Sequence, residues 1–306
     1  MIELETTNDI YQSLGMQIGP LYYELRAYDG WGVDVLECIS AHVACNNMQC
    51  RPDRIIHLTQ ISQEDLSDTT QPPFPDRVWP QLTGIHPPLD WQQRRSRLDT
   101  VWFSTQTVHT FWKAETDSAI GPVRLHLPWG LIIDDIIARG GGLIHGGLAS
   151  FNDSGFLFLA PPSGGKSTTL STAPTSWQVF SDDAALLWPG NQKEWHASPL
   201  PAWGNIINPG MEWLYPEMKL GRCCQLKGLV ILEKASEIQL QPTSPIDIVA
   251  NLYRSLNEYP AAIMGSGQQW GPLFRMAARM ARDLSGWTLS LPRHGDIWPL
   301  LIKEAG

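Results

Sequence analysis

Residues 160–167 of this 306-residue chain read Ala-Pro-Pro-Ser-Gly-Gly-Lys-Ser and directly follow the apolar run Phe-Leu-Phe-Leu at 156–159. The apolar run is typical of a buried strand, and the polar residues from Ser167 onward favour a short helix. A strand, a glycine-rich loop and a helix in this order form a phosphate-binding loop of the type G-x-x-x-x-G-K-[ST], here with Ala160 in place of the first glycine. Backbone N–H groups and the positive helix end would converge on one point, where a polyphosphate can bind. The stretch predicts a nucleotide site in an α/β fold.

The loop residues have separate expected roles. We expect six consecutive residues to contact the nucleotide: Ser163, Gly164, Gly165, Lys166, Ser167 and Thr168. Lys166 would reach the terminal phosphates of ATP, and the Ser167 hydroxyl would complete the ligand shell of Mg²⁺, which prefers oxygen ligands and keeps several waters. Ala160 is compatible with such a loop only if its position does not need a positive φ. The alternative is a glycine-rich turn that merely spells Gly-Lys-Ser, which the strand and helix on either side disfavour.

Two adjacent carboxylates, Asp182 and Asp183, end a second predicted strand at 178–183, only sixteen positions after Lys166. One short helix fits between that strand and the loop. Such a pair allows a division of labour, in which one carboxylate orients Mg²⁺ and the other accepts the proton of an attacking hydroxyl. An acidic turn at the end of a strand is the alternative interpretation.

Three segments together resemble a known family: Ile144-His145-Gly146-Gly147-Leu148, the loop, and Val-Phe-Ser-Asp-Asp-Ala-Ala-Leu-Leu at 179–187. In order and spacing they resemble the catalytic core of HPr kinase/phosphorylase, a fold shared with phosphoenolpyruvate carboxykinases. The resemblance is specific over about residues 130–190. It is closest to the HPr-kinase-like proteins of peptide natural-product pathways, including kinases of lasso-peptide precursors.

The resemblance implies a P-loop kinase that uses ATP and Mg²⁺ to phosphorylate a serine or threonine hydroxyl of a peptide or small protein. By position, Lys166 and Ser167 would contact the triphosphate and Mg²⁺, Asp182 would be the base and Asp183 a metal ligand. His145 would lie near the carboxylates and help to set their charge, although a histidine satisfied within the core is the alternative. The family's further metal-side glutamate and its glycine-containing signature have no counterpart here, so Glu194 is only a placeholder. We therefore do not expect the family's phosphorylase activity or hexameric assembly to transfer, and the oligomeric state stays open.

The rest of the chain suggests two regions, an N-terminal α+β recognition region at 1–125 and a nucleotide-binding catalytic domain at 126–306. Alternating and periodic apolar residues predict strands and helices in both, which together fit a mixed sheet with helical cover. Strands are expected within 22–30, 54–61, 121–127, 226–234 and 287–292, a hairpin within 101–115, and helices within 33–45, 128–141, 247–257 and 272–284. The polar, proline-rich stretch from Ser62 to Asp99 is expected to be a long loop or linker.

Three further groups of residues have both a functional interpretation and a structural one, which is packing or solvation. Cysteine and histidine on one helix face could hold Zn²⁺, but they are commonly core, as are tryptophans, of which there are 14. A basic cluster after the acidic pair could stabilise the transferred phosphoryl group, and a row of arginines could face a partner, although solvation explains either. The candidate zinc ligands are Cys38, His42, Cys45 and Cys50. The basic cluster is Lys219, Arg222 and Lys227, and the arginine row is Arg275, Arg279 and Arg282. For Cys223 and Cys224 only packing is expected.

Composition limits the classes of function. The 22 Lys and Arg against 31 Asp and Glu give a net charge of −9, which argues against a general binder of nucleic acid backbones. The acidic N-terminus, the absence of a long apolar run and five scattered cysteines favour a cytoplasmic protein without a membrane span. The expected partners are a peptide or small-protein substrate and other enzymes of a peptide-maturation pathway. A small-molecule kinase, a carboxykinase-like phosphoryl transferase and a nucleotide-binding scaffold without activity remain alternatives.

Overall fold

The computed structural model describes residues 12–28, 30–42, 51–58, 92–95, 99–103, 109–114, 129–200, 223–257, 270–292 and 295–305. The chain divides into two compact units, Met1–Pro128 and Trp129–Gly306. Each unit contains its own sheet with both parallel and antiparallel pairs of strands, so the mixed α+β class expected from the sequence is confirmed.

The first unit contains a six-stranded sheet in the order β1-β2-β3-β6-β5-β4. In β2 every second side chain is buried, as the alternation of Leu-Tyr-Tyr-Glu-Leu-Arg-Ala predicts, and α1 packs against β1 and β2. The bounds are β1 (Gln12–Ile18), β2 (Leu21–Ala27), α1 (Gly30–His42), β3 (Arg54–Leu58), β4 (Gln92–Arg95), β5 (Asp99–Phe103) and β6 (His109–Ala114). The predicted hairpin is β5–β6.

One expectation for this unit is wrong. The stretch from Ser62 to Asp99 was expected to hold no regular element, yet Gln92–Arg95 forms β4, which pairs antiparallel with β5. A polar strand at the edge of a sheet needs no apolar pattern, because its backbone bonds to one neighbour suffice. Residues 59–91 lie outside the described part of the chain.

The sheet of the second unit is organised around one long strand, β13. Its first residues pair with β12, its remaining length pairs in parallel with β15 on the same side, and β9 runs parallel along its other side. Beyond β9 come β8 and β10, and beyond β12 come β11 and β7. The strands are β7 (Gly142–His145), β8 (Gly147–Phe151), β9 (Ser154–Leu159), β10 (Gln178–Ser181), β11 (Ala184–Pro189), β12 (Trp195–Pro199), β13 (Cys224–Lys234), β14 (Gln239–Pro242) and β15 (Ser285–Leu291).

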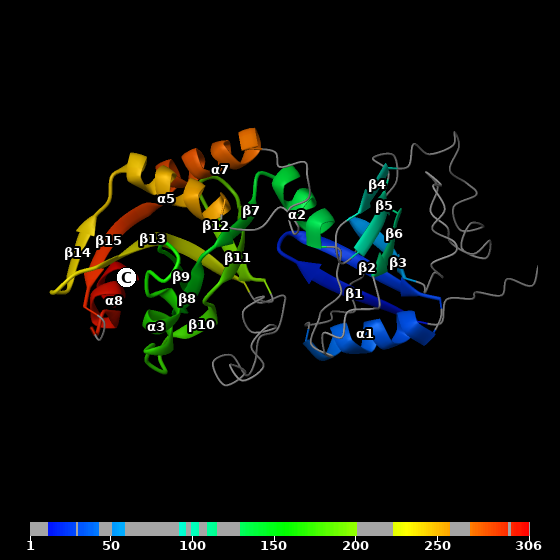
Figure 1. Cartoon of the computed structure of the whole chain (residues 1–306), viewed down its shortest axis with the longest axis horizontal. Coiled ribbons are helices and arrows are strands. Elements are labelled where there is room, and N and C mark those ends of the chain that lie inside the picture. The colour runs from blue at the N-terminus through cyan, green and yellow to red at the C-terminus, as the bar shows by residue number, and fades with distance from the viewer. Residues whose placement is uncertain are drawn as a thin grey trace, which may run out of the picture. The chain divides into compact units, whose positions relative to one another are not determined.

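Helices cover both faces of this sheet (Figure 1). On one face lie α5 (Pro245–Asn257) and α7 (Trp270–Asp283), which pack against each other, with α2 (Trp129–Ala138) against β7 and α7. On the other face lie α3 (Lys166–Ser171) and α8 (Trp298–Ala305), whose buried residues share a core with β9, β13 and β15. The interpretation of tryptophan as core is confirmed for four of the described residues: Trp177, Trp188, Trp195 and Trp298.

The glycine pair at 146–147 interrupts what the sequence shows as one apolar run. Before it, β7 pairs with β11; after it, β8 pairs with β9 and β10. A Cβ atom at Gly147 would collide with Cδ1 of the buried Leu170 side chain in α3, so a larger residue here would require that side chain to move. At this break the chain passes from β7, at one end of the strand order, to β8, near the other end.

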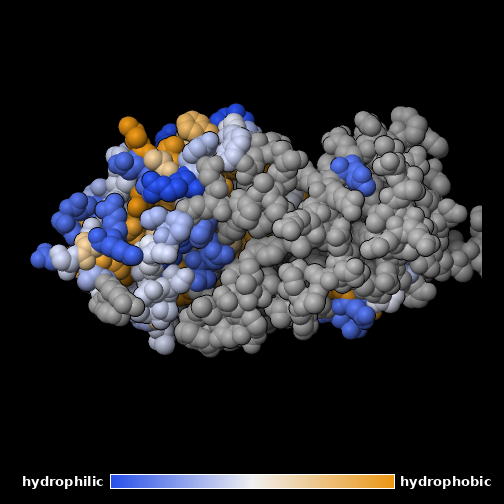
Figure 2. Space-filling view, viewed as in Figure 1, coloured by the Kyte–Doolittle hydropathy of each residue, from blue (hydrophilic) through white to orange (hydrophobic). Residues whose placement is uncertain are grey.

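The surface of the second unit is largely hydrophilic in the view of Figure 2, with apolar residues reaching the surface over α5 and α7. Ile246 and Phe274 are exposed on these two helices. None of the helices in the described part of the chain is both long and apolar enough to cross a membrane.

Candidate functional site

The loop between β9 and α3 has a backbone that depends on its glycines. Ser163 and Gly165 have positive φ values of 59° and 100°. The Gly164 N–H donates to the Pro161 carbonyl at 2.8 Å, and a Cβ atom at Gly164 would lie 2.6 Å from the Ala160 Cβ. Ala160 itself does not have a positive φ. Alanine is therefore compatible with this position, and the missing first glycine does not distort the loop.

Lys166 is the first residue of α3 and is only 7% exposed. Its ammonium group donates a hydrogen bond to the Ala160 carbonyl at 3.0 Å, so the side chain folds back across the loop that precedes it. A cation is thereby held against the first residue of the loop. Ser167 and Thr168 follow as exposed residues of the first helical turn.

The register of three strands places the acidic pair at the same edge as the loop. β8 is antiparallel to both β9 and β10, with Gly147 opposite Phe158 and Leu148 opposite Ser181. β9 and β10 therefore run in the same direction and end at the same edge, two strand spacings or about 10 Å apart. Asp182 and Asp183 directly follow β10, as the loop directly follows β9.

Ser181 shapes the turn that carries the two carboxylates. Its buried hydroxyl accepts the N–H groups of Asp183 and Ala184 at 3.2 and 3.1 Å, a local side-chain turn that fixes where the next residues point. Both aspartates are half-buried. Among the described residues, the Asp182 carboxylate has no hydrogen-bonding partner, so it is available to a ligand.

His145 ends β7 and lies next to this turn. Its Nε2 atom is 3.2 Å from Oδ1 of Asp183, and the neighbouring Gly146 N–H donates to the Asp183 carbonyl at 2.9 Å. The structure thus brings together His145, Asp183 and Asp182 beside the loop. The histidine contacts Asp183, so it orients that carboxylate and leaves Asp182 unengaged.

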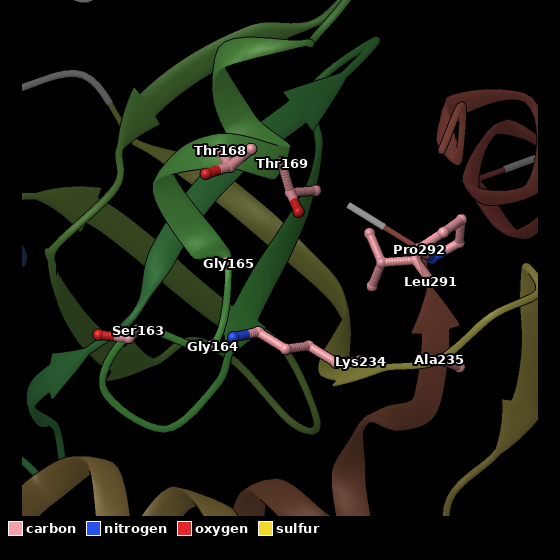
Figure 3. Close-up of a pocket in the computed structure, with 9 residues that line it drawn as sticks. All are labelled: Ser163, Gly164, Gly165, Thr168, Thr169, Lys234, Ala235, Leu291 and Pro292. Carbon is pink, nitrogen blue, oxygen red and sulfur yellow. The ribbon is translucent and has the colours of Figure 1, made fainter. Parts of the chain in front are cut away.

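A pocket of about 430 Å³ opens between the loop and the ends of β13 and β15 (Figure 3). Figure 3 shows Lys234 extending from the end of β13 with its ammonium group beside Gly164, and Thr169 facing Leu291 across the opening. The residues that line the pocket are Ser163, Gly164, Gly165, Thr168, Thr169, Lys234, Ala235, Leu291 and Pro292.

Sequence reasoning missed Lys234, which it treated only as the end of a strand. The relevant signal is the parallel register of β13 with β9, in which Ile231 lies opposite Leu159. Lys234 comes three residues later, level with the loop. It provides a second cation at the loop, in addition to Lys166.

Two other residues considered from the sequence lie away from the loop. Glu194 sits in the exposed turn after β11, at the opposite end of that strand from Asp183, so it does not serve as a third carboxylate of the site. Lys227 lies near the start of β13, level with Gly155 and Phe156 at the beginning of β9. Lys227 is therefore not a basic group of the loop, while Lys219 and Arg222 lie outside the described residues.

The arginine row on α7 is not simply solvated. Arg279 and Arg282 both contact Asp283, at 3.4 and 3.1 Å, and the Arg279 guanidinium lies 5.4 Å from the ring centroid of Trp195. The Trp195 indole N–H also donates to Asp283 at 3.2 Å. Burial raises the pKa of this carboxyl, but the hydrogen bonds from Trp195 and Arg282 outweigh burial and lower the pKa below its ordinary value. The cluster ties α7 to β12, whereas Arg275 is exposed.

The cysteine and histidine hypothesis for Zn²⁺ is not tested, because the side chains of Cys38 and His42 and all of Cys45 and Cys50 lie outside the described residues. No group of three or more His, Cys, Asp and Glu side chains suited to a metal occurs within the part of the chain that the structure describes. Cys223 and Cys224 are free thiols. Cys224 is buried, as expected from packing, and burial raises its pKa to about 12, whereas Cys223 is exposed, so the packing expected for it is wrong.

Mg²⁺ fits the residues at the loop edge without needing such a cluster. This ion is usually bound by one or two carboxylates together with substrate phosphates and water. Asp183 and Asp182 supply half-buried carboxylates, and the exposed Ser167 hydroxyl lies in the first turn of α3, beside the loop. The donor set is therefore suitable for a metal held jointly with a nucleotide.

The fold and the site define an α+β protein with a glycine-rich strand–loop–helix segment at a sheet edge that also carries two carboxylates. The sequence profile of the family described as "SynChlorMet cassette protein ScmC" matches residues 113–303, and the chain belongs to that family. No curated protein matches the sequence.

Among solved structures, the chain is similar to the "Hpr(Ser) kinase/phosphatase from Coxiella burnetii". The identity is 13%, the match covers 53% of this chain and 91% of that chain, and the TM-score is 0.28. A similarity this weak supports no argument about fold or activity. The expected membership of a peptide natural-product pathway stays a prediction.

Proposed function

We propose that this protein is a kinase that uses ATP and Mg²⁺ to phosphorylate a hydroxyl group of a peptide or small protein. The observation that carries the proposal is the buried Lys166 ammonium, held inside the loop at 160–165 with Asp182 and Asp183 at the same sheet edge. A cation held at a glycine-rich loop suits a polyphosphate, and nearby carboxylates suit a metal and a proton acceptor. Together the two features suit phosphoryl transfer.

In the proposed reaction, the loop N–H groups and Lys166 hold the β- and γ-phosphates, and Lys234 adds a second positive charge beside Gly164. Mg²⁺, when bound through Ser167 and Asp183, would neutralise charge on the phosphate oxygens. The acceptor oxygen attacks the γ-phosphorus, the bond from that phosphorus to the β,γ-bridging oxygen breaks, and ADP leaves. Asp182 takes the proton of the acceptor hydroxyl. His145 orients Asp183 and so keeps the two carboxylates in different roles.

The acceptor class is proposed from the resemblance of the three motifs to kinases of peptide and protein serines. The first unit, with a sheet whose edge strands are β1 and β4, is a suitable recognition module, because an extended peptide can add to a sheet edge. The proposed setting is a peptide natural-product pathway in which this kinase works beside other maturation enzymes. A metabolite kinase is the second candidate, favoured by the basic Lys234 in the pocket beside the loop.

A transfer assay tests the proposal. Labelled ATP and Mg²⁺ are incubated with short peptides encoded beside the gene and, separately, with a small alcohol and a small carboxylic acid. Added phosphate is located by mass spectrometry. We expect phosphoserine or phosphothreonine on a peptide. Transfer only to the small molecules would move the protein to the metabolite kinases, and ATP binding without any transfer would overturn the kinase assignment in favour of a scaffold.

Variants of Asp182 and Asp183 distinguish the proposed base from the proposed metal ligand. Asp182→Asn should keep ATP binding and lose transfer by a factor of about 10² to 10⁴, the usual contribution of a positioned base. Asp183→Asn should lose transfer and also weaken the dependence of ATP binding on Mg²⁺. Glu194→Gln, a carboxylate at the far end of β11, is the matched control and should behave like the wild type. Normal turnover by Asp182→Asn would reverse our assignment of the base.

A further inference from the structure

A second hollow of about 250 Å³ continues from the pocket at the loop. It is lined by Thr168, Thr169, Thr172, Leu291, Gly295, Asp296 and Trp298. Three of these residues, Thr168, Thr169 and Leu291, also line the first pocket. The two hollows therefore form one groove that runs along α3, from the loop to the start of α8.

The groove leaves the loop on the side away from the carboxylates. The sheet order is β10-β8-β9-β13, with β15 beyond β13. Asp182 and Asp183 follow β10, on one side of the loop strand β9, whereas Lys234 and Leu291 end β13 and β15, on its other side. A triphosphate on the loop must direct its reacting end toward the carboxylates. Its other end, which carries the nucleoside, then points into the groove.

We propose that this groove is the nucleoside subsite of the ATP site, a proposal that rests on the function proposed above. Its volume at the loop end lies within the range of roughly 300–1,000 Å³ typical of small-molecule sites. Leu291 and Pro292 provide apolar surface for the flat face of a base. The threonines of α3 line the opposite wall.

Asp296 gives the far end of the groove a hydrogen-bond acceptor. This exposed residue caps α8, because its Oδ1 atom accepts the Trp298 N–H at 3.3 Å. Its other oxygen, Oδ2, has no hydrogen-bond partner in the described ranges. A carboxylate accepts hydrogen bonds from the hydroxyl groups of a ribose or the amino group of a base. Inorganic triphosphate offers neither group, so Asp296 would distinguish the two ligands.

Titration calorimetry with ATP and with inorganic triphosphate, both in excess Mg²⁺, tests the subsite. The wild type should bind ATP at least ten-fold more tightly than triphosphate. Asp296→Asn keeps a good helix cap but loses the negative charge, and it should weaken ATP binding about ten-fold while leaving triphosphate binding unchanged. Glu304→Gln, an exposed carboxylate on the same helix, is the matched control and should change neither affinity.

A purely structural role of Asp296 gives a different pattern. If the residue only caps α8, Asp296→Ala lowers thermal stability, whereas Asp296→Asn binds ATP like the wild type; that result would overturn the subsite. Equal wild-type affinity for ATP and triphosphate would also overturn it, although the phosphate site would stand. Absence of binding by either ligand would instead refute the proposed function itself.

Discussion

Replacing Lys166 by methionine tests the central feature of the site. Methionine is unbranched and apolar, so it fills the position of a 7% exposed stem while removing the charge and the hydrogen bond to the Ala160 carbonyl. A hydrogen bond to a charged group contributes about 1.5–3 kcal/mol, but removing it also relieves the cost of burying the ammonium group. We expect the unfolding free energy without ligand to change by no more than about 1 kcal/mol.

The effect on ATP should be much larger than the effect on stability. At a free ATP concentration of one hundred times Kd, binding stabilises the folded state by about 2.7 kcal/mol. Loss of the main phosphate cation by an expected hundred-fold in affinity reduces this to about 0.4 kcal/mol at the same concentration. For a unit of this size, the wild-type shift of roughly 5–11 °C in Tm would fall to about 1–2 °C.

Differential scanning fluorimetry with and without ATP and Mg²⁺ measures both quantities. Lys227→Met is the matched control, since it removes an exposed lysine at the other end of the sheet. That variant should keep the full ATP shift. If Lys166→Met folds normally and is still protected by ATP as well as the wild type, the loop does not hold the phosphates and the reasoning is refuted.

Three further outcomes are expected. Gly164→Ala should fold but lose most ATP binding in calorimetry, because the added Cβ would lie 2.6 Å from the Ala160 Cβ and must shift the loop; unchanged affinity would contradict this. Lys234→Met should weaken both ATP and inorganic triphosphate about five-fold relative to Lys227→Met, and an effect on ATP alone would place Lys234 with the nucleoside instead. The pKa of Asp283 is lowered in the folded state, so its stabilising contribution is complete above its ordinary pKa of 3.8 and is lost as pH falls below it. Asp283→Asn should therefore destabilise by about 2 kcal/mol near neutral pH in urea titrations and flatten the acid dependence, whereas an unchanged acid limb would show that the cluster is not responsible.

Local pattern was sufficient to predict much of the second unit. The apolar run 156–159 became β9, and the strand expected at 226–234 became part of β13. The helices expected at 247–257 and 272–284 became α5 and α7. These elements carry their own signal, because a buried strand or an amphipathic helix shows in the order of its apolar residues.

Residues that join the site through sheet register were not predictable in the same way. Lys234 reaches the loop only because β13 runs parallel to β9, and Asp296 lines the groove only because α8 covers the same face as α3. Neither the pairing of β13 with β9 nor the position of α8 can be predicted from the residues next to Lys234 or Asp296 in the sequence. For the same reason Glu194 and Lys227 were considered for the site, although Glu194 lies in the turn at the far end of β11 and Lys227 lies near the start of β13. The polar strand β4 was missed since an edge strand needs no apolar alternation.

The arrangement of strands separates the two tasks that we propose for the site, proton acceptance and binding of the nucleoside, and this separation has a measurable consequence. The acidic turn after β10 and the end of β13 are divided by β8 and β9, which is three strand spacings or about 14 Å along the sheet. The groove that Asp296 lines begins at this end of β13 and continues away from the acidic turn. Sites more than 7–10 Å apart without shared partners contribute additively to free energy. We therefore expect Asp182→Asn to lower the transfer rate and Asp296→Asn to lower ATP affinity. The double variant should show both effects in full, so that the two fold-changes multiply. Single-turnover assays over a range of ATP concentrations measure the rate and the affinity separately. A double variant that is no worse than Asp182→Asn in both transfer and affinity would mean that the two residues act on the same end of the nucleotide, and the direction we assign to ATP on the loop would be wrong.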